Sequence, residues 1–314
     1  MKILVKKAMT MVLTLFLVSV VTFSAFQVIN GDVVTAKLGV DATKEQVEEL
    51  KEEYGLNKSI PVRYAEWLQG AIRGDFGDSY SYNVPVGKLV AERMEVTVGL
   101  GLIAILLIII VALPLGILAS RTRNGIGGHI INTVNQIFMS VPHFFLGMLI
   151  CLVFGIFLKW FTPGDYVSLK DSVSGYFGYM IFPAIAIAIP KIAMLVKFLK
   201  TSVIRQMNQD YVRTARSKGN SEKRILYHHV LRNALIPVLT FLAMVIAEVL
   251  AGSIVLEPVF NLPGLGRLLV VSISSRDYPV VQVIVLYIAA VVIVMNCIVD
   301  ILYQYLDPRV KDAL

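Results

Sequence analysis

The sequence has little charge and lacks the short motifs of the common catalytic sites. Only 16% of its 314 residues are charged, against about 25% in a typical soluble domain. It contains no GxxxxGK[ST] phosphate loop, no HExxH and no GxSxG. We therefore expect no catalytic site and no bound cofactor in this chain. Any energy for driven work would have to come from another protein.

Cysteine and histidine are also scarce. The two cysteines, Cys151 and Cys297, both lie within apolar runs, where we expect them to pack as small hydrophobic side chains. Two such residues exclude a disulfide framework and a CxxC metal site. The four histidines are not spaced as a metal-binding set, and we interpret each as a polar interfacial or core residue: His129, His143, His228 and His229.

Long apolar runs dominate what is present. Hydrophobic residues make up 56% of the chain, and its mean hydropathy is +0.72. A helix needs about 20 mostly apolar residues to cross the hydrocarbon core. The first run is too long for a cleavable signal peptide, so we interpret it as a retained helix. Six runs meet the length requirement: 8–29, 96–119, 131–158, 177–200, 235–256 and 280–304.

The Lys and Arg residues between these runs predict the orientation. With the N-terminus inside, 17 of the 29 fall on the cytoplasmic side. Residues 30–95 hold eight Lys/Arg against twelve Asp/Glu, whereas residues 201–233 hold seven against two. Both termini and 201–233 are therefore predicted to be cytoplasmic. The net charge of +7 reflects this topology and does not indicate nucleic-acid binding.

The external segment, residues 30–95, is long enough to fold. Thr43 and Gln46 have capping-box spacing, and Gly55 is placed to close the helix that follows. A second amphipathic helix is predicted to begin near Pro61, with Val62, Ala65, Leu68 and Ile72 on one side. The segment is either a solvated cap on the membrane domain or a dock for an external partner.

The cytoplasmic segment before the fifth run predicts two short helices joined at a corner. Asp210 is placed to cap the first, and Gly219 to end it in the left-handed conformation. Ser221 is placed to cap the second, which leads to Pro237 at the first turn of the fifth span. The stripe of the second helix is Ile225, Leu226, Val230 and Leu231. A basic amphipathic segment is often only a membrane-surface helix, and composition alone favours that alternative.

The order Ala, four residues to Gly, then a His/Asn/Pro tail resembles the cytoplasmic "EAA" loop of binding-protein-dependent ABC importer permeases. The matching residues are Asp210, Tyr211, Arg213, Ala215, Arg216, Lys218, Gly219, His229, Arg232, Asn233 and Pro237. Other stretches resemble the B-type permease of the dipeptide/oligopeptide/nickel subfamily: "YGLNKSIPVRYAEWL", "RGDFGDSY", "SVPHFFLG", "LEPVFNLPGLGRLL", "SRDYPVVQ" and "DILYQYLDPRV". Two features depart from the family: "INGDVV" replaces the usual Pro-Gly-Asp-Pro-like turn, and Thr214 replaces an acidic residue.

This resemblance implies an all-α integral membrane protein with six transmembrane helices of the type I ABC importer permease fold. The expected divisions are 1–95, the first helix and external segment; 96–306, the transmembrane domain with its coupling loop at 205–233; and 307–314, a cytoplasmic tail. The implied partners are a homologous second permease, two ATPases that bind ATP and Mg, and an extracellular or periplasmic solute-binding protein. The implied location is a bacterial or archaeal cytoplasmic membrane.

The substrate implied by the resemblance is a short peptide, with nickel or a metal chelate as the alternative within the family. An ion-coupled secondary transporter working alone is an alternative from another class. It usually contains inverted repeats with interrupted helices, which the sequence does not indicate. A non-transporting membrane scaffold is a third hypothesis. It predicts that disruption of the Gly219 corner leaves uptake intact.

Charged residues within the spans are costly and suggest function. Lys191 and Glu248 lie at similar depths, so we expect them to approach each other or one polar cavity, as a helix-joining ion pair or as a substrate contact. By resemblance, the stretch after the fifth span suggests a re-entrant or extracellular gate, with an interfacial cap as the alternative. Its candidates are Glu257, Pro263, Gly264, Gly266 and Arg267, the last a possible partner of Glu257. Pro114, Pro142 and Pro190 are expected to kink their spans.

Overall fold

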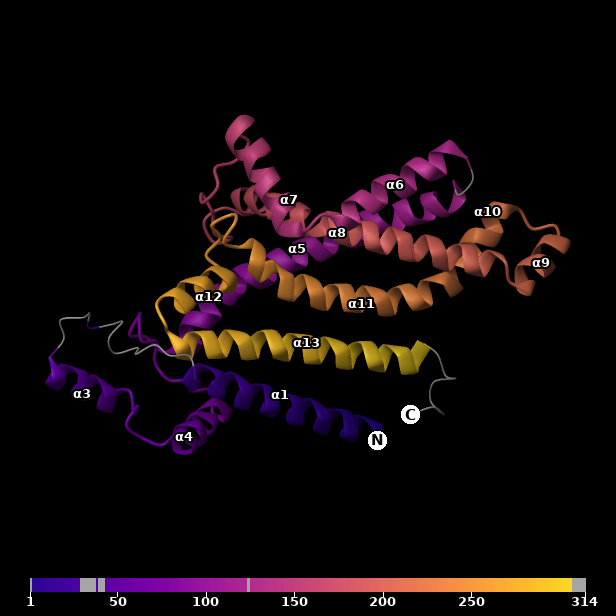
Figure 1. Cartoon of the computed structure of the whole chain (residues 1–314). Coiled ribbons are helices and arrows are strands. Elements are labelled where there is room, and N and C mark those ends of the chain that lie inside the picture. Colours follow the sequence, from indigo (N-terminus) through magenta and orange to yellow (C-terminus); the bar gives the residue numbers. More distant parts are fainter. Residues whose placement is uncertain (1, 29–37, 39–42, 123–124, 307–314) are drawn as a thin grey trace. The chain divides into compact units, whose positions relative to one another are not determined.

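The computed structural model describes residues 2–28, 38, 43–122 and 125–306, which are almost entirely helical (Figure 1). Within those ranges there is no β-strand, and Asp78 and Pro85 form an isolated bridge. The all-α prediction is confirmed. The chain forms two compact units, residues 1–97 with 263–294 and residues 98–262 with 295–314. Helices α5 (Val86–Arg121) and α13 (Tyr278–Leu306) begin in the first unit and continue into the second. The "INGDVV" turn and the tail 307–314 lie outside the described residues.

The described residues contain five helical stretches that are long and apolar enough to cross a membrane, and six if one bent pair counts as a single span. The bent pair is the third span, and the sequence-predicted runs correspond to the six in order. The straight stretches are Lys7–Phe26, Val86–Arg121, Val173–Met207, Glu222–Leu256 and Tyr278–Val299.

The third span is interrupted. The span consists of helix α6 (Ile126–Ser140) and helix α7 with its π-helical continuation η1 (His143–Phe157). The bend between these two parts is 94°. Val141 is extended, as expected for a residue before proline, and Pro142 caps α7. The kink predicted at Pro142 is therefore a full break, and the expectation of uninterrupted helices is wrong. Pro114 and Pro190 lie inside α5 and α8 (Val173–Met207), which continue through them.

The first unit has a core built from three helices. The N-terminal part of α5, the short helix α12 (Leu265–Ser274) and the N-terminal part of α13 contribute its buried side chains. They are Val86, Leu89, Val90, Leu265, Leu268, Val280, Val283 and Ile284. Burial of this apolar surface holds the start of the second span to the start of the last one.

The two helices predicted between the first and second spans form as the sequence predicts. Helix α3 (Lys44–Glu53) begins with the Thr43–Gln46 capping box. It ends at Gly55, whose φ of +64° is left-handed, while Leu56 N donates to Lys51 O at 2.8 Å. Helix α4 (Ile60–Ile72) has Pro61 in its first turn. Local capping rules therefore define both helices.

A buried carboxylate joins the segment between the first and second spans to the start of α13. Asp277 is fully buried and accepts hydrogen bonds from Ser79 Oγ, from Tyr80 N at 3.1 Å and from Ser81 N at 3.2 Å. The Tyr80 ring stacks on Tyr54 at a centroid distance of 4.2 Å. The end of α3, the "RGDFGDSY" loop and α13 are thus held together within the first unit.

Helix α8 is central to the second unit and packs against α6, α7 and α11 (Leu231–Leu256). Figure 1 shows α8 running beside α11. Phe198 of α8 stacks on Phe241 of α11 at a centroid distance of 4.3 Å. Tyr179 donates a hydrogen bond to the carbonyl of Phe260 at 2.6 Å, just beyond the end of α11. The fourth and fifth spans are therefore a tightly packed pair.

Candidate functional site: the Gly219 corner and the polar residues of the spans

The segment after the fourth span folds into a helix, a corner and a second helix. Helix α9 (Asp210–Ser217) is followed by α10 (Glu222–Arg224), the π-helical stretch η2 (Ile225–Val230) and α11. In α9, Val212 and Ala215 are buried, and Tyr211 is half-buried with its hydroxyl 3.0 Å from Gln206 Oε1. The Tyr211 hydroxyl thus ties α9 to the end of α8, and α9 packs against η2.

Gly219 makes the corner in the left-handed conformation that the sequence predicts, with φ of +78°. Its N–H donates to Arg216 O at 2.9 Å, and Asn220 N donates to Ala215 O at 3.3 Å. This pair of bonds is a Schellman motif, which satisfies the last carbonyls of the helix. A Cβ added at Gly219 would meet nothing within 4 Å. Backbone conformation alone therefore demands glycine here.

The start of α9 differs from the prediction. Gln209, whose side chain makes no capping hydrogen bond, occupies the N-cap position, and Asp210 is the first helical residue. Asp210 instead lies 3.3 Å from the Arg213 guanidinium. A carboxylate in the first turn still favours the helix, because it complements the positive end of the helix dipole. The assignment of Asp210 as the cap was wrong by one position.

The second half of the corner continues into the membrane without a separate helix. Ser221 caps α10 as predicted by accepting from Arg224 N at 3.4 Å, and the stripe Ile225, Leu226, Val230 and Leu231 is buried. Residues Glu222–Leu256 form one continuous helical stretch. Pro237 lies inside α11 and not in its first turn, which corrects the prediction. The reason is that the helix already begins at the Ser221 cap.

An ion pair bridges the corner. Arg216 Nε lies 2.7 Å from Glu222 Oε1, and Arg216 Nη2 donates to Glu222 Oε2 at 3.2 Å. Hydrogen bonding to Glu222, and then its charge, raises the pKa of the Arg216 guanidinium. The two-pronged geometry fixes the direction of α9 relative to α10. Thr214, where the family pattern has an acid, instead donates to the carbonyl of Asp210.

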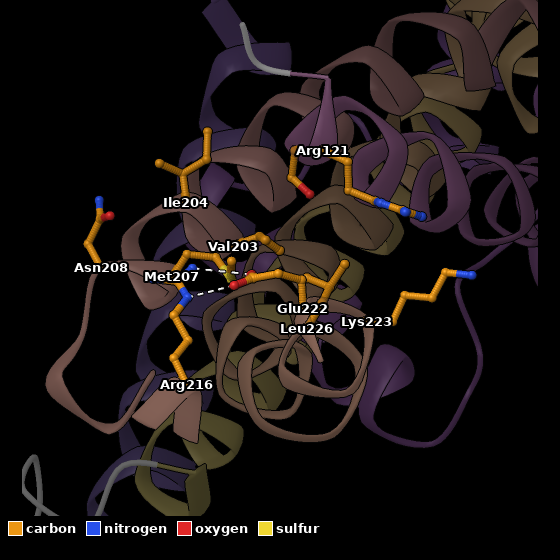
Figure 2. A pocket seen from close by; sticks show the side chains of 10 residues that line it. Arg121, Val203, Ile204, Met207, Asn208, Arg216, Glu222, Lys223 and Leu226 are labelled. Carbon is orange, nitrogen blue, oxygen red and sulfur yellow. Dashed lines mark hydrogen bonds and ion pairs between the residues drawn. The ribbon is translucent and has the colours of Figure 1, made fainter. Parts of the chain in front are cut away.

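A pocket of about 430 Å³ lies beside this ion pair, between the ends of α5 and α8 and the start of α10 (Figure 2). Figure 2 shows the Arg216–Glu222 pair at its wall, with Arg121 and Lys223 also lining it. The exposed surface of the corner is strongly polar. Its other exposed matching residues are Arg213, Lys218, His229, Arg232 and Asn233. Polar groups face outward while apolar ones anchor the corner, which suits a docking surface.

Within the spans, Lys191 of α8 and Glu248 of α11 form an ion pair, as the sequence predicts. The Lys191 side chain is 20% exposed and that of Glu248 51%. His143, which we interpreted as a polar interfacial or core residue, is half-buried directly after the break in the third span. Its Nε2 would lie 3.8 Å from a Cβ at Gly252, one helical turn after Glu248.

The stretch after the fifth span is divided between the units. Glu257 is fully buried at the end of α11, in the second unit, whereas Arg267 is exposed on α12, in the first. Their pairing stays a prediction. Gly264 caps α12 with an extended backbone, and Pro263 O accepts from Arg93 at 3.4 Å. Gly266 lies inside α12, and the left-handed turn residue of the stretch 257–267 is Asn261, with φ of +55°.

Comparison with known proteins decides the family. Residues 112–312 match the family described as binding-protein-dependent transport system inner membrane component, and residues 1–101 match its N-terminal region. The chain belongs to this family of transport permeases. As a family member it is a multi-pass inner membrane component of a transport system that depends on a binding protein.

Three relatives illustrate the similarity over almost the full length of this permease. A probable peptide ABC transporter permease protein of Sinorhizobium fredii is 32% identical, with 98% of each chain covered. A putative peptide transport system permease protein of Brucella abortus is 36% identical over the same shares. The oligopeptide transport system permease protein AppB of Bacillus subtilis is 33% identical, with 94% of each chain covered.

Proposed function

We propose that this permease forms half of the membrane pathway through which a binding-protein-dependent ABC importer takes up short peptides. The observation on which the proposal mainly depends is the polar corner, held by buried anchors and a Schellman motif, in a chain of this family. The names of the three relatives favour peptide over nickel. The partners are a homologous second permease, two ATPases that hydrolyse ATP with Mg, and an external binding protein, and both termini face the cytoplasm.

In this proposal the corner transmits movement from an ATPase to the fifth span. Val212 and Ala215 anchor α9, and the Arg216–Glu222 pair fixes it to α10. From Glu222 the helical stretch runs without interruption to Leu256, past Glu248. Closure of the ATPases would move the docked corner, and the attached helix would carry that movement to the polar residues of the spans. This chain itself hydrolyses nothing.

The substrate is tested by uptake in cells with and without this chain. We expect deletion to abolish uptake of labelled di- to pentapeptides while uptake of labelled nickel, free or chelated, stays at the level of the parent strain. A plasmid-borne copy should restore peptide uptake. Loss of nickel uptake alone would overturn the peptide assignment and leave the importer architecture standing. Peptide uptake that persists in de-energised cells lacking ATP would contradict the ATPase partnership.

The Lys191–Glu248 pair is proposed to line the pathway. We expect the neutral double variant Lys191→Met/Glu248→Gln to reach the membrane and bind the ATPases normally but to import peptides severalfold more slowly. Each single variant should reduce the amount of protein in the membrane, because it leaves one charge unpaired. The measurements are initial uptake rates and the amount of permease in purified membranes.

The matched control is the exposed external ion pair Lys58–Glu66, whose atoms lie 2.8 Å apart. Lys58→Met/Glu66→Gln removes the same two charges from an exposed site and should leave uptake unchanged, since exposed pairs contribute little. An unchanged uptake rate in the Lys191/Glu248 double variant would assign that pair to helix packing alone.

A further inference from the structure

We propose that the external helix α4 does not lie in solvent but is embedded in the membrane leaflet at the Phe26 end of α1, with lipid covering its remaining apolar side chains. Helix α1 (Lys2–Val28) contains the membrane span Lys7–Phe26. In the proposed orientation this leaflet is the outer one. The inference does not depend on the transported substrate.

The depth of α4 follows from the residues of α1 that it touches. Tyr64 of α4 forms a hydrogen bond with Ser19 at 2.7 Å, and its ring lies edge-on to Phe23 at a centroid distance of 5.3 Å and to Phe16 at 6.4 Å. These α1 residues lie about 5 to 15 Å below the Phe26 end, at about 1.5 Å per residue. One leaflet of the hydrocarbon core is about 15 Å thick. A helix with these contacts therefore lies beside the leaflet and not above it.

The residue types of α4 suit that position. Tyr64 and Trp67 both face α1, with Trp67 at a centroid distance of 6.2 Å from Phe23. Tyr and Trp are enriched where hydrocarbon meets headgroups. With 13 residues, α4 is about 20 Å long, too short to cross the bilayer. Its length fits a helix that lies along the interface.

Apolar side chains remain exposed on α4 away from its contacts with α1. Ile72 is 80% exposed and Val62 46%, and both point about 80° or more around the helix from Tyr64 and Trp67. In water this exposed apolar surface would be unfavourable, by about 25 cal/mol per Å². Glu66, which points about 120° away from Ile72, pairs with Lys58. An apolar side next to a charged side, at leaflet depth, is the pattern of a helix seated in lipid. Lipid is therefore the occupant that the contacts with α1 favour.

Spin labels on two sides of α4 test this placement. The permease is assembled with its partners in lipid nanodiscs after Cys151 and Cys297 are replaced by Ser, and a nitroxide is attached to Ile72→Cys or to Glu66→Cys. Six residues separate the sites, so they point about 120° apart around the helix. We expect the Ile72→Cys label to collide with oxygen severalfold more often, and with aqueous chromium oxalate severalfold less often, than the Glu66→Cys label.

Equal collision with chromium oxalate at the two sites would overturn the proposal and make α4 a solvated cap. Protection of the Ile72→Cys label that appears only when the binding protein is added would also overturn it, because the face would then be a protein dock. Peptide uptake by both labelled variants shows that they are folded. Failure of the lipid placement with uptake intact leaves the proposed function untouched.

Discussion

Replacement of Gly219 by valine is expected to lower peptide uptake and the recovery of bound ATPase, by up to about thirtyfold. The left-handed conformation costs a side-chain-bearing residue about 1–2 kcal/mol, which divides the ratio of formed to unformed corners by about five to thirty and sets the upper limit of the loss. Because valine is β-branched, its energetic cost in this conformation should lie at the upper end of that range. Because a Cβ at this position meets no neighbour within 4 Å, steric overlap adds nothing to the loss. Uptake and ATPase co-purification from solubilised membranes measure the effect.

A graded series separates conformation from the simple loss of a glycine. Asn tolerates the left-handed region, so Gly219→Asn should retain more uptake than Gly219→Val. Gly127 of α6 also has open space around it but lacks a positive φ, and Gly127→Val is the matched control, expected to be close to the parent. Normal ATPase recovery with Gly219→Val would remove the corner from the coupling pathway. It would also favour the non-transporting scaffold if uptake were unchanged.

Replacement of Asp277 by alanine is expected to release the external loop. Hydrogen bonds to a charged acceptor contribute about 1.5–3 kcal/mol each, and removal of the acceptor leaves the Ser79 hydroxyl and two amides without it. If the closed loop loses about 3 kcal/mol of stability relative to the open one, the open fraction of the loop at residues 79–81 rises about a hundredfold. We expect hydrogen exchange of the Tyr80 and Ser81 amides to accelerate by that order, measured by mass spectrometry on peptides that cover them.

The neighbouring acid provides the comparison. Asp78 is exposed, and Asp78→Asn should change exchange at Tyr80 and Ser81 very little. Asp277→Asn keeps one carbonyl oxygen, so its exchange rates should fall between those of the parent and Asp277→Ala. Unchanged exchange in Asp277→Ala would show that the Tyr54–Tyr80 stack and the neighbouring core hold the loop without the carboxylate.

The features that the sequence predicted correctly are local. Thr43, Gly55, Gly219 and Ser221 act on backbone groups no more than a few residues away, so capping rules apply without knowledge of the tertiary structure. Lys191 and Glu248 were paired from depth alone, because the bilayer restricts where charges can lie. The prediction of Asp210 as the N-cap was wrong because the adjacent polar residue, Gln209, can occupy that position instead.

The features that were missed depend on contacts distant in sequence. Asp277 and Ser79 are 198 residues apart, and no periodicity connects them. The run 131–158 is apolar on both sides of Pro142, so hydropathy alone could not distinguish a kink from a 94° break. The face of α4 that packs on α1 is set by Tyr64 and Trp67, not by the aliphatic stripe that the periodicity suggested.

In the proposed coupling, the uninterrupted helical stretch from Glu222 to Leu256 would act as a lever. Its 35 residues measure about 50 Å, and a tilt of about 5° around its middle moves each end by about 2 Å in opposite directions. Within this stretch the π-helical turns of η2 lie beside the corner, and Pro237 lies inside α11. In the proposed mechanism the stretch would deliver a displacement of the corner to the opposite face of the membrane as a reversal of direction.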